Sequence, residues 1–192
     1  MSGWLSRRMV ERNIIGEEEQ EIYQFGVKNG IIILINITTA FLIGLFTEQL
    51  LLVCIFTLSF MTLRSFTGGY HCDSSLFCYI GSSFVLFIPV YTGSLFVRMS
   101  VMVMLLTLAA AVGIIIALSP MHSKKRKLDY AEKKYFGRRA RVIVILQAAV
   151  FLGLWYLGYN SYAYAVYSSI CIIAVLMLAG KAQLYIQLHM EK

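Results

Sequence analysis

The sequence predicts an all-α polytopic membrane protein with about six transmembrane helices and an N-terminal amphipathic interfacial helix. Two observations lead to this fold class. Of the 192 residues, 59% are hydrophobic and only 14% are charged, whereas a soluble domain is about 45–50% apolar and about one quarter charged. The apolar residues also gather in long uncharged runs, which suit lipid because a charge at the bilayer centre costs about 2.5 kcal/mol or more. The length suits a single integral membrane domain over residues 1–192.

Residues 1–28 are expected to form the interfacial N-terminal segment. Trp4, Met9 and Ile14 fall roughly on one face of a helix, among arginine residues, and this pattern is typical of a helix that lies in the membrane interface. No secretory signal peptide is visible, because nine charged side chains precede the first long apolar run, which begins at Asn29.

Five uncharged runs predict the membrane spans. The first four runs are Asn29–Thr47, Gln49–Leu63, Ser74–Val97 and Met99–Ser123. The fifth, Val142–Gly180, has 39 residues, and one straight helix of that length would be about twice a ~30 Å hydrocarbon core. It must fold back, and the turn residues of Gly158–Ser161 predict a helical hairpin there. The second run is short for a full crossing and could be re-entrant.

A basic block predicts the orientation in the membrane. Nine of the 17 basic residues lie within residues 124–141 with only two acidic residues, so this block carries the whole net charge of +7. Such a block between apolar runs is typical of a cytoplasmic loop that contacts anionic lipid. We therefore expect residues 119–141 to form that loop and not to bind nucleic acid. Counting spans from it places both termini, and the connection over residues 64–75, on the cytoplasmic side.

The connection over residues 64–75 is the candidate catalytic segment. Together with the cysteine that follows, it contains six candidate site residues: Arg64, Gly68, Gly69, His71, Asp73 and Cys78. Polar groups inside a membrane protein are costly, so they mark candidate functional sites. A thiol with a pKa of about 8.5 is mostly protonated at neutral pH and needs a base to become a nucleophile. His71 could be that base and Cys78 that nucleophile.

A bend is needed to bring His71 and Cys78 together. On one continuous helix, seven residues of separation would leave them about 10 Å apart along the axis, which is too far for proton transfer. Gly68–Gly69 supplies a bend. With Ser75 as the N-cap of the third span, Cys78 lies in the first helical turn, where the helix dipole favours the thiolate. Cys72 adjoins His71, and neighbours in an extended chain point apart, so Cys78 is the preferred nucleophile.

Other interpretations of these residues remain open. His71, Cys72, Asp73 and Cys78 are all metal-ligand types, but their spacing matches no zinc motif, and we expect neither a metal nor a cofactor. Asp73 could orient His71 or cap the next helix. The main alternative function is a small peptide or ion transporter without covalent catalysis, in which polar residues of the first span line a path.

The pattern Arg-x3-Gly-Gly-x-His-x6-Cys, from Arg64 to Cys78, resembles that of the accessory gene regulator B (AgrB) family. The whole-chain layout is also similar, with a charged N-terminus, paired spans around the motif and a basic segment before a final hairpin. The resemblance implies a membrane cysteine endopeptidase of Gram-positive bacteria. Such enzymes cleave the C-terminal tail from a small propeptide, AgrD, and promote cyclisation of the remainder into a thiolactone or lactone quorum-sensing peptide.

The resemblance also implies roles for individual residues. His71 would be the base, and Cys78 the nucleophile that forms a thioester intermediate. Arg64, Gly68 and Gly69 would be supporting motif residues. The family is expected to act on the cytoplasmic side of the bacterial cell membrane, with an AgrD-like propeptide as its partner and a homodimer as its assembly.

Overall fold

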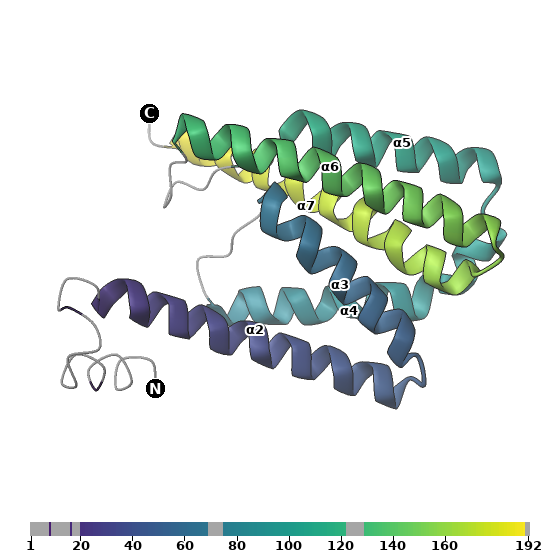
Figure 1. The fold of residues 1–192 in the computed structure, drawn as a ribbon, viewed down its shortest axis with the longest axis horizontal. Coiled ribbons are helices and arrows are strands. Elements are labelled where there is room, and N and C mark those ends of the chain that lie inside the picture. The colour runs from purple at the N-terminus through teal and green to yellow at the C-terminus, as the bar shows by residue number, and fades with distance from the viewer. Residues whose placement is uncertain (1–7, 9–15, 17–19, 69–74, 122–128, 191–192) are drawn as a thin grey trace. The chain divides into compact units, whose positions relative to one another are not determined.

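The computed structural model describes residues 8, 16, 20–68, 75–121 and 129–190. These residues form six helices and no strand (Figure 1). The helices are α2 (Gln20–Phe46), α3 (Leu50–Thr67), α4 (Ser75–Arg98), α5 (Val101–Leu118), α6 (Tyr130–Tyr156) and α7 (Asn160–Met190). The predicted interfacial helix falls mainly on residues 1–19, nearly all of which lie outside the described ranges. Residues 1–39 and 40–192 form two separate compact units.

The six helices coincide with the predicted spans. Four of them, α3, α5, α6 and α7, are long and apolar enough to cross a membrane, and the apolar parts of α2 and α4 are shorter, at Gly30–Phe46 and Tyr79–Gly93. The short second run belongs to an 18-residue helix, which spans about 27 Å. Large apolar side chains such as Met102, Leu106 and Leu146 are exposed, as expected for surfaces that face lipid. The all-α polytopic prediction is confirmed.

The predicted hairpin lies between α6 and α7. Gly158 adopts a φ of 81°, and the backbone N–H of Tyr159 donates to the carbonyl of Leu154 at 2.9 Å. A glycine just beyond a helix end is the usual residue for such a left-handed turn. The long apolar run therefore folds back where its turn residues predict.

Helix α7 is the centre of the unit formed by residues 40–192. It contacts α3, α4, α5 and α6, and Figure 1 shows it beside α5 and α6. Every residue from Ala163 to Ile170 is buried, so this part of the helix is covered on all sides. Small residues let neighbouring backbones approach closely in a membrane bundle, and this stretch holds Ala163, Ala165, Ser168 and Ser169.

Three predicted boundaries differ from the structure. The segment 119–141 is not a loop throughout, because α6 begins at Tyr130 and the Asp129 N–H donates to Glu132 Oε2 at 3.3 Å in a capping interaction. The connection 64–75 is shorter, because Arg64 belongs to the last turn of α3. The N-terminal segment 1–28 is helical from Gln20, in continuity with the first span.

Candidate functional site

The predicted site residues fall at the junction of α3 and α4. Arg64 is half-buried in the last turn of α3, and Gly68 follows that helix directly. Helix α4 begins at Ser75, which puts the backbone of Cys78 in its first turn. Gly69, His71 and Asp73 lie outside the described residues, and so does the side chain of Cys78. The contact between His71 and Cys78 therefore stays a prediction.

Gly68 occupies a position that only glycine fits. Its φ of 71° and ψ of −148° belong to a region of backbone conformation essentially restricted to glycine. A Cβ atom at this position would also lie 2.5 Å from the carbonyl oxygen of Met121. Both the local conformation and the tertiary contact exclude a side chain, so the chain turns sharply as it leaves α3.

The end of α3 is tied to the segment that follows α5. The backbone N–H of Met121 donates to the carbonyl of Thr67 at 2.9 Å, and Thr67 is fully buried. This segment packs on α6 in turn, because a Cβ added to Gly137 would lie 3.1 Å from Pro120 Cδ. The sequence carries no local pattern that indicates the contacts of Thr67 and Met121. Gly137, a glycine within a helical pattern, is the one residue of the three whose type indicates close packing.

Aromatic and cationic side chains reinforce the contact between α3 and α6. The ring centroids of Phe66 and Phe136 are 6.1 Å apart. The guanidinium of Arg139 lies 4.5 Å from the ring centre of Tyr135 and 6.0 Å from that of Phe66, within the range of a cation–π interaction. The helix turn that carries Arg64 is thus held in place from the side of α6.

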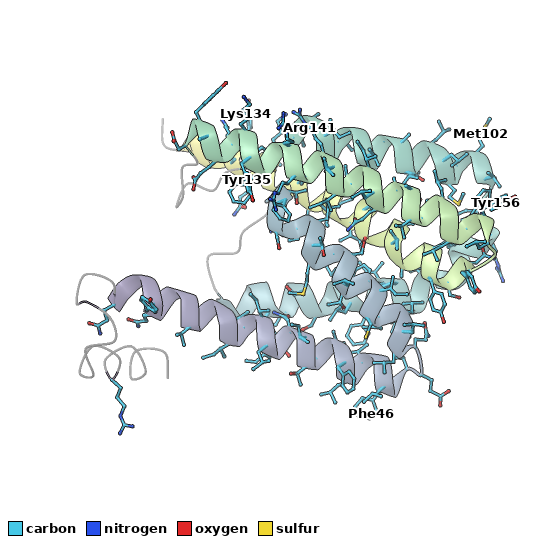
Figure 2. All side chains as sticks on the ribbon, in the orientation of Figure 1. Phe46, Met102, Lys134, Tyr135, Arg141 and Tyr156 are labelled. Atoms are coloured by element: carbon cyan, nitrogen blue, oxygen red, sulfur yellow. The ribbon has the colours of Figure 1, made fainter. Side chains whose placement is uncertain are left out.

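The charged part of α6 borders a cavity of about 380 Å³. Lys133, Lys134, Arg138 and Arg141 line it, together with Ser119, Pro120, Gly137, Val142 and Ile145. Figure 2 shows Lys134 and Arg141 on the first half of α6 and Tyr156 at its opposite end. Cationic side chains therefore gather on the part of α6 that packs beside the end of α3.

Within the described ranges, no group of three or more histidine, cysteine or acidic residues could hold a metal ion. His71, Cys72, Asp73 and the side chain of Cys78 lie outside those ranges.

The fold and the site define a class of protein. It is a polytopic α-helical membrane protein in which a connection that begins at Gly68 and contains polar residues joins two helices. The family model of accessory gene regulator B matches residues 2–178, and the chain belongs to the AgrB family. Membership implies a role in the processing of quorum-sensing peptides, and the resemblance seen in the sequence is confirmed. No curated protein and no solved structure matches the chain.

Proposed function

We propose that this protein is a membrane-embedded cysteine endopeptidase that cleaves the C-terminal tail from an AgrD-like propeptide. The observation that carries the proposal is the motif from Arg64 to Cys78, which lies within the family match. The structure supports it by placing the Cys78 backbone in the first turn of α4. Backbone N–H groups at a helix start favour a thiolate over a thiol.

The chemistry proceeds in two steps. His71 accepts the thiol proton of Cys78, the thiolate attacks the scissile carbonyl, and His71 returns the proton to the departing amine. The amide C–N bond breaks and a thioester forms at Cys78, while the tail leaves as a free peptide. A thiol of the bound substrate then attacks the thioester, which closes a thiolactone and releases Cys78. A substrate hydroxyl would give a lactone.

Gly68 supports the bend that this chemistry requires. It turns the chain directly after α3, and the contact with Met121 fixes where the turn occurs. Arg64 stands one helical turn earlier, and the backbone N–H of Gly68 donates to its carbonyl at 3.3 Å. In this proposal Gly69 extends the bend, and Asp73 orients His71 or caps α4.

The proposal includes an orientation and an assembly. The cationic half of α6 lies on the cytoplasmic side, in accord with the positive-inside rule, and both termini and the catalytic segment share that side of the bacterial cell membrane. The working assembly is a homodimer. Labelling of single introduced cysteines from either side of the membrane, and the mass of the protein in nanodiscs, test these two points.

The decisive experiment uses the full-length protein in nanodiscs with a synthetic AgrD-like propeptide. Intact-mass spectrometry should find an acyl adduct that maps to Cys78 and disappears in Cys78→Ala. The matched control is Cys72→Ser, which should cleave the propeptide normally. An adduct on Cys72 would overturn the choice of nucleophile. Undiminished cleavage by Cys78→Ala would mean that Cys78 is not the nucleophile, and the absence of any cleavage by the original protein would favour a transporter instead.

A further inference from the structure

We propose that the cavity between the end of α5 and the first half of α6 binds the headgroup of an anionic phospholipid. This inference does not rest on the proposed peptidase activity. Four basic residues of α6, Lys133, Lys134, Arg138 and Arg141, line the cavity. Lys134, Arg138 and Arg141 follow a spacing of four and three residues and so share one face of the helix. Like charges at this spacing repel one another, and a bound phosphate would relieve that repulsion.

The other wall of the cavity is apolar. Pro120, Val142 and Ile145 line it, and Val142 and Ile145 are 52% and 56% exposed. Beyond Arg141, the exposed residues of α6 include Leu146 and Val150. The change from charged to apolar surface marks the membrane interface at the level of the cavity. A phospholipid has this same polarity, with its phosphate at the basic residues and its first acyl carbons beside Ile145.

The cavity favours a lipid over an acidic peptide. A soluble acidic segment would satisfy the four cations, but it would leave the Val142 and Ile145 wall to be covered by something else. Basic pockets between transmembrane helices commonly bind anionic headgroups. The small residue Gly137 forms part of the lining and allows Pro120 to approach α6 closely, so the polar and apolar walls lie together.

Native mass spectrometry of the full-length protein in detergent tests the proposal. The probes are phosphatidylglycerol, which is anionic, and phosphatidylcholine, which is zwitterionic. We expect phosphatidylglycerol to bind preferentially, and Arg138→Gln/Arg141→Gln to weaken its binding by about five-fold for each charge removed. Arg139→Gln is the control for Arg138→Gln and Arg141→Gln taken singly, because it removes one charge from the same helix at a residue that lies over Tyr135 and does not line the cavity. Its binding should stay close to that of the original protein.

Several outcomes would overturn the lipid site. The first is equal binding of the two lipids, and the second is a loss of phosphatidylglycerol affinity in Arg139→Gln as large as that in Arg138→Gln or Arg141→Gln. The third is displacement of phosphatidylglycerol by hexaglutamate, which would identify an acidic peptide as the occupant. If the double variant does not fold, the single variants Arg138→Gln and Arg141→Gln provide the test, and each should weaken phosphatidylglycerol binding by about five-fold. Unchanged binding in both single variants would contradict the proposal.

Discussion

Gly68 and Gly158 both have a positive φ and both follow the end of a helix, but the surroundings of the two helix ends differ. Their φ values are 71° and 81°, so each ends a helix in a conformation that L side chains avoid. A Cβ at Gly68 would meet the Met121 carbonyl at 2.5 Å, whereas a Cβ at Gly158 would meet nothing within 4 Å. The first turn is fixed by a distant segment, and the second is fixed only by its own hairpin.

This difference shows which of the two turns is held in a fixed geometry by tertiary contacts. The α6–α7 turn needs only to reverse the chain, and local hydrogen bonds such as that from Tyr159 to Leu154 suffice. The turn after α3 leads into the candidate catalytic segment, and its backbone is bonded to the segment after α5. A catalytic group works only when its support holds it within a fraction of an ångström. We infer that the contact between Thr67 and Met121 provides that support.

Gly68→Ala should produce the largest effect. The substitution places a side chain in a glycine-only region of backbone conformation, at a cost of about 1–3 kcal/mol. It also forces Met121 to move, which adds about 1–3 kcal/mol. Thermal unfolding of the purified protein should show a clear loss of stability, and propeptide cleavage should fall with it. Stability equal to that of the original protein would mean that the end of α3 is not anchored at this point.

Gly158→Ala is the matched substitution at the other end and should have a smaller effect. The left-handed conformation costs about 1–2 kcal/mol for a side chain, and no tertiary clash adds to it. The same unfolding experiment measures the loss, while the cleavage rate of the folded protein should not change. A fall in cleavage as large as that of Gly68→Ala would abolish the distinction between the two turns.

The sequence predicts the helices better than the contacts between them. Uncharged runs locate the spans because the cost of a buried charge acts residue by residue, and the length of Val142–Gly180 demands a hairpin. The same rule placed the end of the second span at Leu63, although Arg64 and the next three residues remain helical. The basic block predicts a loop, but its residues from Tyr130 onward are helical. Charge indicates that a segment is in contact with water or headgroups and does not determine its backbone conformation.

In the candidate site, too, the sequence predicts the residues better than the contacts between them. Residue types and spacing suffice to single out His71, Cys78 and the glycine pair as candidates. The bond between Thr67 and Met121 joins segments far apart in the chain, and neither residue carries a local pattern that predicts it. Long-range packing of this kind depends on the whole bundle. The pairing of His71 with Cys78 stays a prediction, and the adduct experiment addresses the cysteine of that pair.

The hydrogen bond between Ser59 and Ser169, in the middle of the bundle, has the smallest expected effect on stability. Its effect can be compared with those of the turns at Gly68 and Gly158. The Ser59 and Ser169 hydroxyls lie 2.6 Å apart and are buried between α3 and α7. Ser169 also donates to the Val166 carbonyl at 2.7 Å, so its single proton is engaged and Ser59 must donate to Ser169. A double-mutant cycle of Ser59→Ala and Ser169→Ala should give a coupling of about 0.6 kcal/mol, the average for such bonds in membranes.

Ser65→Ala is the control for this cycle. Ser65 lies on the same helix, is exposed, and donates to the Met61 carbonyl of its own helix at 2.7 Å, so its coupling with Ser169 should be zero. A measured Ser59–Ser169 coupling well above 1 kcal/mol would mean that polar contacts at the bundle centre contribute as much as the turn at Gly158. The contacts at the centre of the bundle and those at its ends would then contribute similar amounts to stability. The end of α3 would no longer stand out by its contribution to stability.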